Sequence, residues 1–107
     1  MAQKFDHKLM KNAVLRDYEK LNTIYRSMES KYQLGLLDSH DLMVLSALAI
    51  LLQCQRDYMD VLTEMGKLRK NSSSEELAFV MRRSEECFKK MGQATIVVGS
   101  FVNSFED

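Results

Sequence analysis

Proline is absent from this 107-residue sequence, and glycine occurs only four times. Both residues interrupt helices, so their scarcity favours long, unbroken helical segments. Hydrophobic residues make up 46% of the chain and charged residues 28%, which is typical of a globular protein and argues against a disordered one. A chain of this length suits one domain, so we expect residues 1–107 to fold as a single all-α unit.

An excess of charge of one sign is also lacking. The 15 Lys and Arg residues balance the 15 Asp and Glu residues, and the formal net charge is zero. Nucleic acids and acidic lipid surfaces both attract proteins that carry a basic excess. The composition therefore argues against nucleic acid as a partner and disfavours a membrane.

Long apolar runs are missing as well. The longest uncharged stretches run from Leu42 to Gln55 and from Met91 to Phe105, and both are shorter than the roughly 20 apolar residues that span a bilayer. The first residues of the chain lack the apolar core of a secretory signal. We therefore expect a cytoplasmic protein without a transmembrane helix.

Cysteine and histidine are scarce, and neither forms a recognisable site. Cys54 and Cys87 have no second cysteine and no histidine at metal-ligand spacing, which predicts two buried, reduced thiols and no metal or cofactor. His7 and His40 lie far apart, and neither has an obvious catalytic partner. Glycine-rich phosphate loops and nucleophile elbows are absent. We expect a protein that is not an enzyme.

The first helix is predicted over about residues 5–34. Its apolar residues follow one another at alternating steps of three and four, which is the spacing of a heptad seam. Gly35 follows the last of them and suits a helix end, because glycine adopts the left-handed conformation without a Cβ clash. The seam consists of Val14, Tyr18, Leu21, Tyr25, Met28 and Tyr32.

The second helix is predicted over about residues 39–70, with Asp38 as its N-cap and Asp41 in the first turn. Further apolar residues flank its inward stripe, so more than half of the helix circumference is apolar. Such breadth indicates the central helix of the fold. The inward stripe consists of Val44, Leu48, Leu51, Gln55, Tyr58, Leu62 and Met65.

The third helix is predicted over about residues 74–104. Ser72 or Ser73, followed three residues later by Glu75 or Glu76, is the pattern of a capping box. The heptad stripe that follows continues without an error almost to the end of the chain. It consists of Leu77, Val80, Ser84, Cys87, Met91, Ala94, Val98, Phe101 and Phe105.

Two short connections force neighbouring helices to run antiparallel. The predicted fold is therefore an all-α, antiparallel up-down-up three-helix bundle with coiled-coil-like heptad packing, which self-associates. In this register Cys54 and Cys87 lie near each other on neighbouring helices. The methionines on the seams are expected to fill the core. These are Met28, Met65, Met81 and Met91.

One end of the predicted bundle lacks charge. The outward stripes there carry small or uncharged residues, whereas an isolated bundle would carry charged ones. We therefore expect a helix of a protein partner, or of a second copy, to pack on this end. The predicted partner-binding residues are Met43, Ser46, Ala49, Gln53, Gln93, Val97, Ser100 and Ser104.

The preferred interpretation is a non-enzymatic helical protein-interaction module, a small adaptor or chaperone-like protein. In size and character the chain is similar to the small helical chaperones of bacterial secretion systems. Two other classes stay open. Residues 46–58 resemble the long helices of BAR-type membrane-bending dimers, which implies a membrane-peripheral coiled coil. Residues 7–12 resemble the phosphoaccepting motif of histidine phosphotransfer domains, with His7 as acceptor, although Asn12 stands in place of the motif's glycine.

Overall fold

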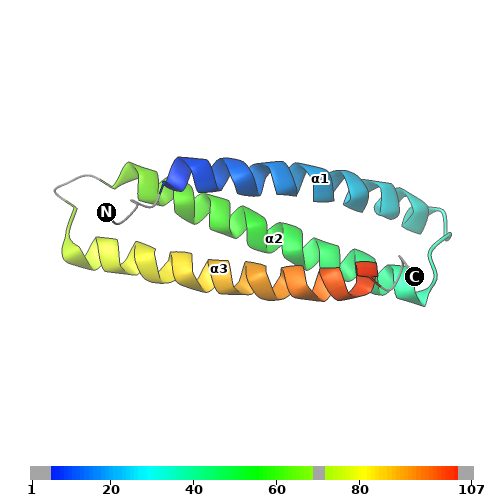
Figure 1. Ribbon diagram of the computed structural model, residues 1–107. Coiled ribbons are helices and arrows are strands. Elements are labelled where there is room, and N and C mark those ends of the chain that lie inside the picture. Colours follow the sequence, from blue (N-terminus) through cyan, green and yellow to red (C-terminus); the bar gives the residue numbers. More distant parts are fainter. Residues whose placement is uncertain (1–5, 69–71, 104–107) are drawn as a thin grey trace.

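The computed structural model describes residues 6–68 and 72–103, and it consists of three long α-helices (Figure 1). These are α1 (His7–Gln33), α2 (Ser39–Lys67) and α3 (Ser74–Asn103). The described ranges contain no strand, and the predicted all-α class is confirmed. The predicted helix ends at residues 5, 70 and 104 lie outside the described residues.

Local capping interactions set the helix ends. The Asp6 carboxylate accepts two backbone N–H groups at the start of α1. At the start of α2, Asp38 and Asp41 form a reciprocal capping box, in which each carboxylate accepts the other residue's backbone N–H. Gly35 follows α1 with a φ of 70°, the left-handed conformation that glycine adopts without strain. The Ser73 hydroxyl accepts a backbone N–H in the first turn of α3.

Helix α2 lies between the other two helices (Figure 1). It packs against both α1 and α3, whereas within the described ranges no Cα atom of α1 lies within 8 Å of a Cα atom of α3. Most of the buried residues belong to α2, as expected for the central helix. α1 and α3 therefore cover α2 from two sides and approach each other only through side chains.

Polar contacts between α1 and α2 show how the two helices are matched along their length. Lys11 Nζ donates to Thr63 Oγ1 at 2.7 Å, and Arg56 Nε donates to Tyr18 Oη at 2.8 Å. As residue numbers rise along α1, the numbers of their partners on α2 fall. These bonds lie near the protein surface and contribute more to the register than to the free energy of unfolding.

Two aromatic pairs join α2 and α3, in addition to their aliphatic core contacts. The rings of His40 and Phe101 meet edge to face with their centroids 5.7 Å apart. Tyr58 and Phe88 form a second edge-to-face pair at the same distance. An ion pair also joins Arg83 to a carboxylate of α2 at 2.6 Å. Both of its side chains are exposed, so the pair contributes little to stability.

The core is divided into two clusters along the length of α2. The larger cluster lies toward the start of α2 and the smaller one toward its end. Because α2 supplies residues to both clusters, it connects the two halves of the molecule. The buried residues of the larger cluster are Val44, Ala47, Leu48, Leu51, Ala94 and Val98, and those of the smaller cluster are Val14, Tyr58 and Leu62.

Gln55 is the buried polar residue of the described core, with only 2% of its surface exposed. Its side-chain Nε2 donates to Asp17 Oδ2 at 2.7 Å. Its Oε1 has no hydrogen-bond partner among the described residues. A buried carbonyl oxygen without a donor opposes folding, because it loses its bonds to water.

Leu51 provides a test of the core. Because Leu51 is buried in the larger cluster, we expect Leu51→Ala to lower the free energy of unfolding by about 2–5 kcal/mol, as measured by urea denaturation. The neighbouring Ile50 is exposed, so Ile50→Ala should change it by only about 0.5 kcal/mol. Equal losses in the two variants would contradict the assigned orientation of α2.

Gln55 provides a second test. Methionine at this position would fill nearly the same volume and remove the buried oxygen, while the exposed Asp17 would regain water. We expect Gln55→Met to raise the free energy of unfolding by about 1 kcal/mol in urea denaturation. Gln55→Ala should instead lower it, because it leaves a cavity. A clear loss of stability in Gln55→Met would show that the bond to Asp17 outweighs the unpaired oxygen.

Candidate interaction site

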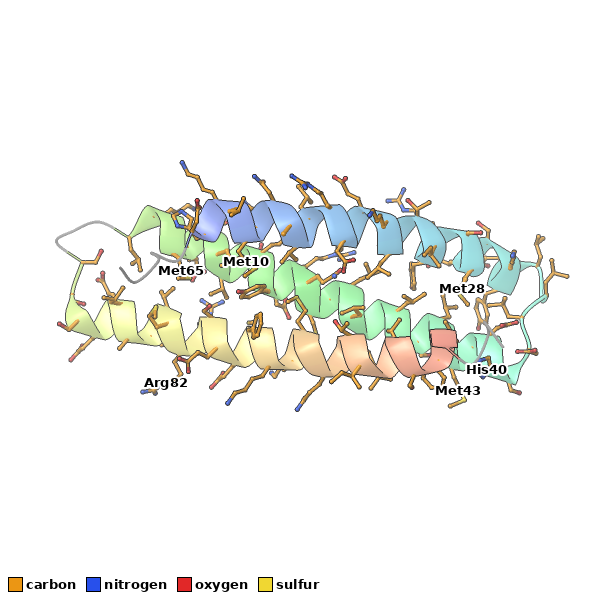
Figure 2. All side chains as sticks on the ribbon, viewed as in Figure 1. Met10, Met28, His40, Met43, Met65 and Arg82 are labelled. Atoms are coloured by element: carbon orange, nitrogen blue, oxygen red, sulfur yellow. The ribbon has the colours of Figure 1, made fainter. Side chains whose placement is uncertain are left out.

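A shallow apolar furrow runs between the start of α2 and the end of α3, at the end of the molecule where Figure 2 labels Met43. We call it the α2/α3 furrow. Its volume is about 400 Å³. The exposed fractions of Ile50 and Val97 are 61% and 47%, which is high for large apolar side chains. The lining residues are Leu42, Met43, Ser46, Ala47, Ile50, Val97 and Phe101.

The predicted partner-binding residues divide between different surfaces. Met43, Ser46 and Val97 line the α2/α3 furrow. Ala49 and Gln53 instead line a smaller, polar hollow of about 210 Å³ between α1 and α2. A helix turns by about 100° per residue, which places these two positions on the α1 side of the outer surface of α2.

The remaining predicted residues lie apart from the furrow. Gln93 and Ser100 are exposed on α3, and neither belongs to the lining of the furrow or of the polar hollow. The Ser100 hydroxyl donates to the backbone carbonyl of Val97. Ser104 lies outside the described residues. The structure therefore brings together three of the eight predicted positions.

A second apolar groove, which the sequence pattern does not reveal, lies at the opposite end of the molecule. We call it the methionine groove. It has a volume of about 410 Å³ and receives side chains from all three helices. Figure 2 shows Met10 and Met65 at this end, far from Met43. The lining residues are Met10, Tyr58, Met65, Met81, Ser84, Glu85 and Phe88.

Met81 corrects an expectation from the sequence. Its heptad position predicts core packing, yet 47% of the side chain is exposed in the methionine groove. Phe88 lines the same groove and is also exposed. Both residues project toward the space between α1 and α3, where the two helices do not approach each other closely enough to cover them. A heptad pattern cannot reveal this separation, because it describes each helix alone.

The lining of the methionine groove contains few polar groups. Tyr58 forms the floor, and Ser84 lies in the same lining. Burial raises the pKa of Tyr58, an effect that the nearby Ser84 side chain partly offsets. The phenol is therefore neutral at physiological pH. Glu85 is the charged residue of the lining, and it forms no ion pair with the described residues.

The candidate phosphoacceptor His7 is the first residue of α1 and is half-buried. Its imidazole lies over Gly66 of α2, where an added Cβ would come within 2.8 Å of Nε2. Glycine at position 66 thus allows the start of α1 to approach the end of α2. Within residues 6–68 and 72–103, no group of three His, Cys, Asp or Glu side chains could hold a metal ion.

Both cysteines are free thiols at the edges of the core. The sequence predicted that they would be buried, but both are half-buried. Burial raises the pKa of the Cys87 thiol, with a further contribution from the negative charge of Asp57. Cys54 lies close enough to add to this rise, which is consistent with the predicted register between α2 and α3. Cys87 is therefore a weak nucleophile at neutral pH.

Comparison with known proteins adds no relative: no protein-family model, curated protein or solved structure matches this chain. In the part of the chain that the structure describes, no helix is long and apolar enough to cross a membrane. What the structure defines is an all-α, three-helix protein with two exposed apolar grooves.

Thiol labelling tests the environment of Cys87. Because burial raises its pKa, the thiolate fraction at pH 8 is smaller than in the unfolded chain. We expect iodoacetamide to modify Cys87 in Cys54→Ser roughly tenfold more slowly in the native protein than in urea, as measured by mass spectrometry. Equal rates in the two conditions would contradict the burial of this thiol.

Proposed function

We propose that this chain is a non-enzymatic protein-interaction module, a small adaptor or chaperone-like protein. In this proposal its helices form an antiparallel up-down-up bundle with coiled-coil-like packing. It acts by self-associating or by binding a helix of a protein partner in the α2/α3 furrow. The observation that carries the proposal is the exposure of Met43, Ile50 and Val97 along a furrow without charged residues.

Exposed apolar side chains that form a continuous patch favour association, because covering them releases water. The furrow lies between two helices, and such a trough suits the apolar ridge of a third helix. Ser46 and Ala47 are small, so they allow a close approach at its centre. The absence of charge from the lining favours an apolar partner face over a charged one.

Charge substitutions test this proposal. In Val97→Glu and Ile50→Glu the new carboxylate would have to be desolvated against the apolar partner face, so we expect loss of self-association or of partner binding. Both positions are exposed, and the free energy of unfolding should change by only about 0.5 kcal/mol. Light scattering over a concentration series measures the self-association, and circular dichroism confirms the helical fold.

Lys89→Glu is the matched control for Val97→Glu, because Lys89 is also exposed on α3 but lies outside the furrow. It should leave association unchanged. The proposal fails if the parent protein is monomeric and Val97→Glu does not lose binding to any helical partner. Co-sedimentation with liposomes would instead support a membrane-peripheral protein. Phosphoryl labelling that disappears in His7→Ala would support a phosphotransfer protein.

A further inference from the structure

We propose that the methionine groove is a second binding site, and that it receives a basic amphipathic helix of another protein. The proposal extends the interaction function proposed above to a different surface. The two sites lie at opposite ends of the molecule, since the groove involves residues 58–65 of α2 and the furrow residues 42–50. Their occupancies can therefore be tested separately.

The shape of the groove suits the anchor side chains of a helix. α2 provides the floor through Tyr58 and Met65, while Met10 of α1 and Met81 of α3 form opposite walls. The backbones of α1 and α3 are separated here, which leaves room between them. A volume of about 410 Å³ falls within the range of roughly 300–1,000 Å³ of ordinary ligand pockets. It can accept a few large side chains.

The lining favours apolar anchors of variable shape. Methionine is flexible and polarisable, so three methionines can adapt to either aliphatic or aromatic side chains. Phe88 adds an exposed ring beside them. Tyr58 is buried and Ser84 is half-buried, so their hydroxyls form only a small part of the lining. The contact surface is therefore the apolar face of an amphipathic segment.

The charges around the methionine groove indicate which residues the polar face of the bound helix carries. Glu85 lies in the lining on the α3 side. Asp17 lies seven residues after Met10, and this spacing places it on the same face of α1. The lining contains no basic residue, and Figure 2 shows Arg82 pointing away from the helices. Lys or Arg beside the apolar ridge would complement the two carboxylates, whereas an anionic lipid surface would be repelled.

Designed peptides test the proposal with the full-length chain. The probe is a fluorescein-labelled 18-residue helix with leucine at i, i+3, i+4 and i+7 positions and lysine along both flanks. A second peptide carries glutamate in place of each lysine. We expect the lysine peptide to bind, as measured by fluorescence anisotropy, and the glutamate peptide to bind roughly tenfold more weakly. Absence of binding by the lysine peptide would overturn the proposal.

Variants of the groove locate the binding. Glu85→Lys should weaken binding of the lysine peptide and strengthen binding of the glutamate peptide, each by several-fold. Glu86→Lys is the matched control, since it makes the same change of net charge on an exposed neighbour outside the lining. Met81→Glu should abolish binding of the lysine peptide, and circular dichroism checks that it remains folded. Equal effects of Glu85→Lys and Glu86→Lys would overturn the charge argument.

Two further outcomes separate this site from the α2/α3 furrow and from a second copy of the chain. Val97→Glu should leave binding of the lysine peptide unchanged. If Val97→Glu abolishes it while Met81→Glu does not, the furrow is the binding site and this inference fails, although the interaction function stands. If light scattering shows a dimer that Met81→Glu dissociates, the occupant is a second copy and the inference is wrong.

Discussion

Burial of the apolar circumference of α2 is the constraint on which this structure depends. The helix is apolar over more than half of its surface, and Leu62 is completely buried. A single neighbour cannot cover so broad a face, because two packed helices share only a narrow strip. α1 and α3 each provide one such strip. Both are therefore held by α2, which explains why it lies between them.

The same constraint creates the α2/α3 furrow and the methionine groove. α1 and α3 are positioned by their contacts with α2, and their backbones stay apart. Side chains at the flank of the α3 stripe, such as Met81 and Phe88, then remain partly uncovered. On the other side of α3, Val97 lines the furrow that α3 forms with α2. A central helix with two covering helices thus leaves apolar side chains exposed in both places.

Polar interactions add specificity at a cost to stability. Gln55 is bonded to Asp17 but leaves one oxygen unpaired inside the core. This arrangement links α1 to one position along α2, and so restricts sliding between two helices that are otherwise held by non-directional apolar contacts. The charge at the methionine groove differs, because Glu85 lies in an otherwise uncharged lining and forms no ion pair within residues 6–68 and 72–103.

By itself, the sequence determined the helices and the central role of α2. Helix ends depend on local capping, so Asp38 and Gly35 could be recognised without any tertiary contact. Periodicity likewise shows which face of each helix is apolar. It does not show the angle at which two helices pack, nor whether two outer helices touch. Only the tertiary structure decided that Met43 and Val97 share a furrow without Ala49, and that Met81 lines a groove, because both depend on the separation between helices.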